Sequence, residues 1–136
     1  THYRGDKDAQ DYMWGWAGLL SDEEIKLLAS YYERQTPAPG IPADPVLSAK
    51  GEAIFKKGIE SQGVPACMAC HGENGEGNGK AVPPVPRLAG QNASYLVKQL
   101  KVYQGDKRPA GLAMHVVVQT LTEEEMDQIA AYLQSK

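Results

Sequence analysis

The sequence predicts an all-α fold for this chain of 136 residues. Three observations lead to that prediction: apolar residues recur at helical spacing, these segments begin with helix-capping residues, and no segment alternates as a strand would. Hydrophobic residues make up 42% of the chain, which is enough for one modest core. We therefore expect one complete helical domain and a smaller helical segment.

The first helix of the complete domain is predicted to follow a proline-rich run that begins after Thr36. The proline density favours an extended linker, which we place at residues 37–45. Asp44 is a suitable N-cap, Pro45 fits the first helical turn, and Gly58 fits the end of the helix. One side of this helix carries Leu47, Gly51, Ile54 and Phe55.

Two more helices are predicted in the second half of the chain. One runs from Asn92 to about Tyr103 and is ended by Gly105. The last helix opens with a capping box formed by Thr122 and Glu125. One side of the first helix carries Tyr95, Leu96, Gln99 and Leu100, and the last helix presents Met126, Ile129, Ala130 and Leu133 at helical spacing.

Two long loops, at residues 72–91 and 105–120, complete the predicted domain. Loops of this length inside a small domain are expected to surround a large group. The first contains a glycine-rich run from Gly72 to Gly79, which could suggest a phosphate cradle or a calcium loop. It links no strand to a helix and its carboxylates lack the alternation of an EF-hand, so a flexible turn is the favoured interpretation.

The beginning of the chain repeats its end at a constant offset of 101 residues. The segment from Leu20 to Ile25 matches the segment that begins at Leu121, and Met13 matches Met114. With a single gap, residues 3–7 also match residues 103–107. Two helices with similar caps could look alike by chance, but the match extends beyond the helices and favours a tandem duplication.

The duplication predicts a division of the chain into unequal parts. Residues 1–36 are expected to be the end of a first domain whose front, with any cofactor motif, is absent from this sequence. Residues 46–136 form the complete domain. The first part carries a net charge of −3, with four Lys/Arg and seven Asp/Glu, whereas residues 37–136 carry ten of each and are neutral.

The motif with the clearest chemistry is Cys67-Met68-Ala69-Cys70-His71. The spacing C-x-x-C-H is the attachment signal for one covalent haem c, with two thiols for the vinyl groups and a histidine for the iron. A zinc site would need a second pair of ligands, which the sequence lacks. A redox dithiol would need a neighbouring βαβ pattern, which is also missing. Cys67 and Cys70 are therefore the predicted thioether positions, and His71 the proximal ligand.

A second iron ligand has to come from elsewhere in the chain. The candidates are Met13, Met68, Met114, Met126, His2 and His115. Met68 lies inside the attachment turn and Met126 on a core face, whereas Met114 stands far along the chain in a loop and is the favoured ligand. His115 is the rival, because a second imidazole would lower the reduction potential relative to a thioether.

The proximal imidazole needs an acceptor for its second nitrogen, and a backbone carbonyl is the usual one. The run from Val82 to Arg87 can supply it because proline keeps its carbonyl and stiffens the loop. Pro86 is the predicted acceptor, although the run could also be an ordinary proline-rich loop.

Composition excludes several classes of function. A net charge of −3 and the absence of basic clusters interleaved with aromatics argue against nucleic acid as a partner. No apolar run approaches the roughly 20 residues of a membrane span, and the first residues lack an apolar signal stretch, so a mature, soluble chain is expected.

Residues from about 44 to 136 resemble a class I cytochrome c domain, most closely the second domain of the diheme cytochrome c4 family. The matching segments are Ala43-Asp44-Pro45, Gly51-x-x-x-Phe55, the C-x-x-C-H motif, residues Pro86 to Gln91, Tyr95-x-x-x-Gln99-Leu100, Met114 and Ala130-Ala131-Tyr132. Residues 1–36 are similar to the end of that family's first domain.

The resemblance implies a class I cytochrome c fold with His71 and Met114 as iron ligands, and with Pro86, Arg87 and Tyr95 at the cofactor. It also implies a periplasmic electron carrier that is no enzyme by itself and transfers one electron per haem to a terminal oxidase, a dehydrogenase or a similar redox protein. The chain departs from the family in having one C-x-x-C-H motif, so Met13 has no haem of its own here.

Two alternatives remain open for this chain. It could be the electron-transfer subunit or module of a larger redox enzyme, with an N-terminal fragment or a second copy packing on residues 1–36. That segment is too short to bury its aromatic residues by itself, although it could also pack on the haem domain. A haem enzyme or ligand sensor with an open sixth position is the third hypothesis.

Overall fold

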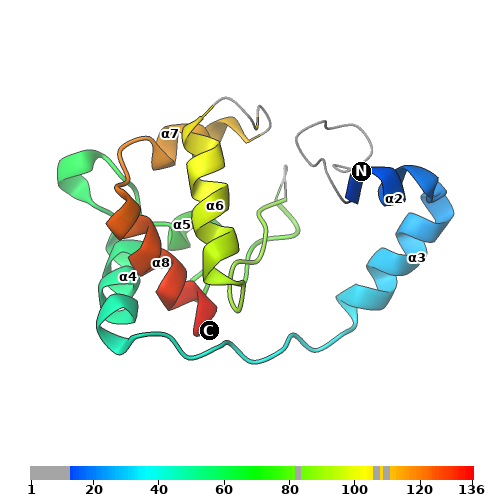
Figure 1. Ribbon diagram of the computed structural model, residues 1–136, viewed down its shortest axis with the longest axis horizontal. Helices are drawn as coiled ribbons and strands as arrows, with labels where there is room; N and C mark the ends of the chain where they lie inside the picture. Colours follow the sequence, from blue (N-terminus) through cyan, green and yellow to red (C-terminus); the bar gives the residue numbers. More distant parts are fainter. Residues whose placement is uncertain (1–12, 82–83, 106–107, 109–110) are drawn as a thin grey trace. The chain divides into compact units, whose positions relative to one another are not determined.

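The computed structural model describes residues 13–81, 84–105, 108 and 111–136. Figure 1 shows the chain as two compact units, Thr1–Pro37 and Ala38–Lys136. The division falls at the start of the proline-rich run. The described residues form helices and contain no strand, apart from isolated bridges between Ile59 and Val64 and between Asn78 and Val85.

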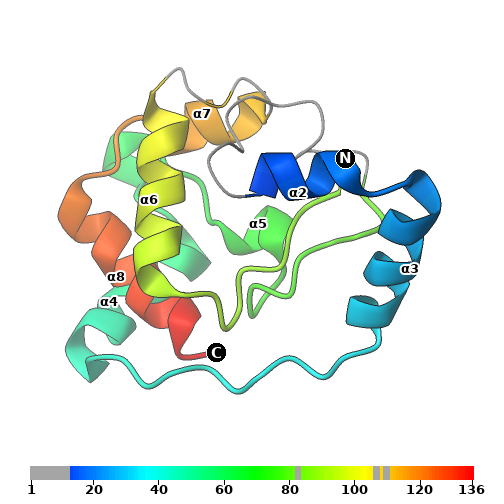
Figure 2. The same cartoon turned by 45° about the vertical axis from the view of Figure 1, so that its right-hand side comes forward.

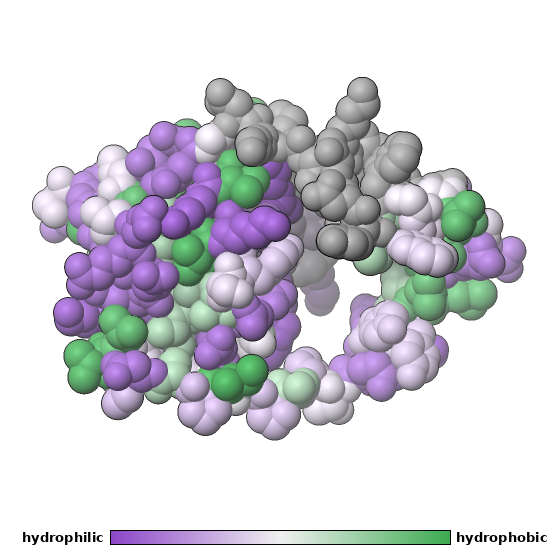
Figure 3. Space-filling view, viewed as in Figure 1, coloured by the Kyte–Doolittle hydropathy of each residue, from purple (hydrophilic) through white to green (hydrophobic). Residues whose placement is uncertain are grey.

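The N-terminal unit contains two described helices, α2 (Met13–Leu19) and α3 (Asp22–Glu33). The side chain of Ser21 accepts from the backbone N–H of Glu24 and the Glu24 carboxylate accepts from the Ser21 N–H, so a capping box begins α3. Most apolar side chains of these helices are exposed. Figure 3 shows hydrophobic residues among hydrophilic ones on the described surface of this unit.

The second unit holds the remaining helices of the structure. They are α4 (Pro45–Lys57), the 3-10 turn η2 (Glu60–Gln62), α5 (Met68–His71), α6 (Ala93–Gln104), α7 (Leu112–Val118) and α8 (Glu123–Gln134). The starts predicted for α4, α6 and α8 are confirmed, with Asp44, Asn92 and Thr122 as N-caps. No helix in the described part of the chain is both long and apolar enough to cross a membrane.

The core of this unit lies where α4 crosses α8 (Figure 1). Gly51 makes the crossing possible, because a Cβ there would stand 1.9 Å from the carbonyl oxygen of Gln128. Phe55 is fully buried and its ring centre lies 5.4 Å from that of Tyr132. The buried neighbours of this pair include Ile54, Met126, Ile129 and Leu133. Helix α6 packs against both α8 and α7 (Figure 2).

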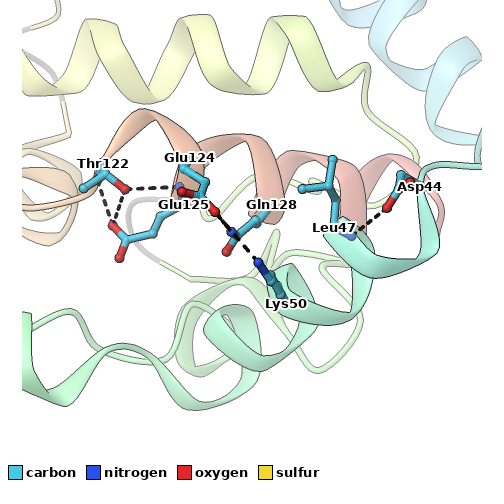
Figure 4. A network of polar contacts seen from close by, with 7 residues as sticks. All are labelled: Asp44, Leu47, Lys50, Thr122, Glu124, Glu125 and Gln128. Atoms are coloured by element: carbon cyan, nitrogen blue, oxygen red, sulfur yellow. Dashed lines mark hydrogen bonds and ion pairs between the residues drawn. The ribbon is translucent and has the colours of Figure 1, made fainter.

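Polar contacts border the same crossing (Figure 4). Asp44 accepts from the backbone N–H of Leu47 at 2.9 Å, which caps α4. On α8, Gln128 donates to Glu124, whose carboxylate also lies 3.8 Å from the Lys50 ammonium of α4. This ion pair is exposed, so it contributes little to stability beside the apolar contacts.

The predicted linker is tied to the second unit by its backbone. The N–H of Ile41 donates to the carbonyl of Gln134 at 2.9 Å, which satisfies a free acceptor at the end of α8. A Cβ at Gly40 would stand 2.5 Å from the carbonyl carbon of Ser135. The residues from 38 onward therefore belong to the second compact unit.

The prediction of an uninterrupted loop at residues 105–120 is wrong, because α7 lies within it. The seven residues of α7 have neither a side-chain N-cap nor an amphipathic period that sequence reasoning could detect. Its support comes from α6 instead: the Gln104 amide donates to the carbonyls of Val118 and Leu121, each at 2.8 Å. The other loop, at residues 72–91, is confirmed as non-helical in its described part.

Candidate functional site

The Cys67 to His71 motif forms a single helical turn, α5. The N–H of His71 donates to the carbonyl of Cys67 at 3.0 Å. Cys67 and His71 are therefore one helical turn apart, on the same side of the turn. Cys67 is half-buried and Cys70 is exposed. His71 is only 7% exposed, which places its imidazole inside the unit. Before any haem is attached, burial raises the pKa of the Cys67 thiol.

The imidazole of His71 is oriented by the proline-rich loop. Its Nδ1 lies 3.0 Å from the carbonyl oxygen of Pro86, the contact that sequence analysis assigns to this residue. A carbonyl can only accept, so Nδ1 carries the proton and Nε2 is left with a lone pair. A histidine fixed in this tautomer presents Nε2 to a metal.

The glycine-rich run does more than the flexible turn that sequence analysis expected. Gly77 donates to the carbonyl of His71 at 2.7 Å, and a Cβ at Gly77 would stand 2.6 Å from the backbone N of Arg87. Its φ of +78° is also one that other residues rarely adopt. Gly75 accepts from Leu88 and Ala89. These contacts brace the Pro86 loop against the histidine turn, and the clustering of glycines was their only sequence signal.

The favoured second ligand, Met114, lies on α7. It is half-buried and packs against the same apolar cluster as Cys67, Met68 and Leu88. The α7 turn starts at Gly111, whose φ of +98° is left-handed and whose carbonyl accepts from the N–H of Met114 at 2.8 Å. Helix α7 thus carries the Met114 thioether on the same core as the attachment turn.

The rival ligand, His115, makes its contacts on a different side of α7 from Met114. Its Nε2 donates to the backbone carbonyl of Arg108, and its ring meets the ring of Tyr103 edge-on at 5.6 Å. The Arg108 carbonyl takes the Nε2 proton, so Nε2 has no lone pair for iron, and only Nδ1, the ring nitrogen nearer the backbone, keeps one. The arrangement favours Met114 over His115 as an iron ligand.

The other candidates lie in different environments. Met126 is fully buried in the core, where sequence analysis placed it as a packing residue, and Met68 belongs to the attachment turn. Met13 begins α2 in the N-terminal unit and is half-exposed. His2 lies outside the described residues, as do the repeat matches at residues 3–7 and 106–107.

Arg87 and Tyr95 have less distinctive positions. Arg87 is exposed and its Nε donates to the carbonyl of Ala89 at 3.2 Å. Tyr95 is 44% exposed in the first turn of α6. Neither is hydrogen-bonded to the His71 turn in the described part of the chain, so their contact with a cofactor stays a prediction.

The residues of this site fit a covalently bound haem. Two thiols and an imidazole with a free Nε2 lie on one turn, and a thioether stands on another segment of the same apolar core. Thiols, imidazole and thioether are the donor set of a c-type haem with histidine and methionine ligands. The apolar surroundings suit the macrocycle, because they keep water from its faces.

Comparison with known proteins supports this interpretation. The family model for cytochrome c matches residues 48–136. Over 98% of its residues, this chain is 38% identical to cytochrome c-552 of Acidithiobacillus ferridurans. Over 89% of its residues, it is 35% identical to a thiosulfate dehydrogenase electron acceptor of Thiomonas intermedia. It spans 56% of the length of each of these relatives.

Two solved structures have the same fold. Cytochrome c4 from Acidithiobacillus ferrooxidans matches 99% of this chain with a TM-score of 0.86 and 35% identity, and 77% of its own chain is covered. A thiosulfate dehydrogenase from Marichromatium purpuratum matches 99% with a TM-score of 0.81 and 30% identity, over 29% of its own chain.

These comparisons confirm the predicted class I cytochrome c fold and the resemblance to cytochrome c4. They also confirm the predicted cofactor, because members of the family carry haem c covalently and this chain has the attachment motif. From the geometry of the Cys67 to His71 turn and the match over residues 48–136, the chain belongs to the cytochrome c family.

Proposed function

We propose that the chain is a one-electron carrier, with haem c attached at Cys67 and Cys70 and its iron bound by His71 and Met114. The observation that supports this best is the 3.0 Å contact between His71 Nδ1 and the Pro86 carbonyl. It fixes a buried imidazole in the tautomer that an iron ligand needs. One-electron transfer by the haem requires no acid, base or nucleophile among the described residues.

The haem supplies the reversible one-electron chemistry, and the residues around it set its conditions. The Pro86 carbonyl strengthens His71 as a donor, whereas the Met114 thioether is a weak donor that favours the reduced state. The apolar core that includes Phe55 and Leu96 limits access of water. A site kept dry and rigid in this way needs little rearrangement when its charge changes by one.

The partner is proposed to be a redox protein, such as a terminal oxidase or a dehydrogenase, in the bacterial periplasm. The neutral charge of residues 37–136 indicates recognition through shape and local charge rather than through a strong overall field.

The ligand assignment is tested with Met114→Ala in the haem-loaded chain. Loss of the thioether should abolish the charge-transfer absorption band of ferric iron bound to methionine sulfur, lower the midpoint potential and allow carbon monoxide to bind the reduced protein. Met13→Leu and Met68→Leu are the matched controls and should keep the band. A wild-type protein that is high-spin when oxidised would overturn the proposal and favour the open-site hypothesis.

A second candidate function is an electron-transfer module of a larger redox enzyme. It is favoured by the likeness to part of a thiosulfate dehydrogenase and by the exposed apolar residues of the N-terminal unit, among them Trp16, Leu27 and Tyr32. A companion chain carrying its own haem is one proposed occupant of that surface, and a second copy of this chain is another. Native mass measurement of the purified protein separates these cases, since a lone monomer would contradict the module.

A further inference from the structure

Four residues between α6 and α7 form a connected set, here called the Tyr103 cluster: Gln99, Tyr103, Arg108 and His115. The guanidinium of Arg108 lies over the Tyr103 ring at 4.6 Å and donates to Gln99 at 2.6 Å. The His115 imidazole contacts two members of the cluster: its ring lies edge-on to the Tyr103 ring, and its Nε2 donates to the Arg108 carbonyl. These contacts connect α7 to the end of α6.

The start of α7 is closely fitted to the same cluster. A Cβ at Gly111 would stand 3.0 Å from the Tyr103 ring, and Gly111 has a φ of +98°. Its carbonyl accepts the first hydrogen bond of the turn, from Met114. The position of the turn is therefore set by Tyr103 on one side and by the His115 hydrogen bond on the other.

Helical geometry links this cluster to the iron ligand. Successive residues of an α-helix point about 100° apart, so Met114 and His115 cannot face the same group. Holding His115 against α6 consequently sets the direction in which Met114 points. A seven-residue helix has little stability of its own, so its rotation depends on such side contacts.

We propose that His115 is a positioning residue for Met114: its hydrogen bond to the Arg108 carbonyl, supported by Tyr103, fixes the rotation of α7 that presents the thioether to the haem iron. This inference rests on the proposed function, because it takes Met114 as the ligand. His115 acts only through Met114 and does not itself bind the haem.

The test compares His115→Ala with His115→Gln in the haem-loaded chain. The glutamine amide can place a donor close to the site of Nε2, whereas alanine cannot. His115→Ala should weaken the methionine–iron charge-transfer band and bind added imidazole roughly fivefold more tightly, the effect expected from losing one hydrogen bond that holds the ligand. His115→Gln should restore both properties.

Val116→Ala is the matched control, since Val116 is the next residue of α7 and is exposed. It should leave the band and the imidazole affinity unchanged. If His115→Ala does not accumulate, His115→Leu replaces it, because leucine keeps bulk and lacks the donor. The inference is overturned if the variant without a donor behaves as wild type, or if glutamine behaves as alanine. A wild-type protein without the band would instead overturn the proposed function.

Discussion

Helices α3 and α8 are counterparts in the internal repeat, yet their environments differ completely. Each begins with a capping box, Ser21 with Glu24 in α3 and Thr122 with Glu125 in α8, and each has three acidic residues in its first turn. Helix α8 buries seven residues, whereas α3 buries none. The same local sequence thus makes a helix in both places, and only the surroundings make one of them a core element.

The difference comes from what each helix packs against within its own unit. Helix α8 is crossed by α4 and flanked by α6. Tyr132 there is 2% exposed and packs on Phe55. Its repeat counterpart, Tyr31, is 54% exposed and meets the ring of Tyr32 at 5.2 Å. One aromatic pair lies inside a core, and the other lies on a surface.

The largest expected effect comes from truncating these equivalent tyrosines. Tyr132→Ala should destabilise the haem unit by about 3–5 kcal/mol, because a large buried side chain is removed and a cavity remains. Tyr31→Ala should cost less than about 1 kcal/mol, which is the scale of an exposed aromatic pair. Urea unfolding of the haem-loaded chain measures both, with haem absorbance following the haem unit and circular dichroism following the helices of the N-terminal unit. Equal losses would show that Tyr31 is buried in solution by a partner or a second copy.

A second pair of substitutions should differ in sign. Gly51→Ala should destabilise by about 1–3 kcal/mol, since its Cβ would overlap the Gln128 carbonyl and push α4 away from α8. Gly15→Ala, inside α2, should stabilise its helix by about 0.5–1 kcal/mol, because alanine restricts the unfolded chain. No described atom lies within 4 Å of a Cβ at Gly15. Thermal unfolding by circular dichroism distinguishes the two, and a stabilising Gly51→Ala would refute the close crossing.

The capping boxes offer a third comparison. Removing the N-cap side chain of either helix should cost about 1 kcal/mol of stability. Thr122→Ala should lower the unfolding free energy of the haem unit, because α8 belongs to its core. Ser21→Ala should instead shorten α3 without moving the haem transition. Hydrogen exchange at the first turns of both helices reports the local effect. A shift of the haem transition by Ser21→Ala would mean that the two units unfold together.

The smallest effect is a pH dependence at the same caps. Burial alone would raise the pKa of Glu125, but hydrogen bonds from the Thr122 backbone and hydroxyl and from Gln62 outweigh it and lower the pKa. The stability that the Glu125 carboxylate contributes to the folded state is therefore complete above its unfolded pKa of 4.5. It is lost as the pH falls through the lower pKa of the folded state. Glu125→Gln should remove this part of the acid sensitivity, as measured by urea unfolding at pH values on both sides of 4.5.

Sequence reasoning located most elements of the haem unit because their signals are local. Asp44, Asn92 and Thr122 cap their helices with their own side chains, and the three helices begin where these residues predict. It missed α7, whose start and end are held by Tyr103 and Gln104 of another helix. Sequence reasoning also predicted a flexible turn for the glycine-rich run. The close approach of Gly77 to the Pro86 loop is a contact between two segments, which the local sequence does not specify.

The sequence by itself determined the cofactor and the helix starts and led to the proposed attachment residues, because each depends on groups a few residues apart. The tertiary structure alone decided that α8 is a core helix while α3 is not, that the linker joins the haem unit, and that His115 faces α6. These outcomes depend on which segments meet in space. Burial and long-range hydrogen bonds are properties of that meeting, and no local pattern of residues specifies them.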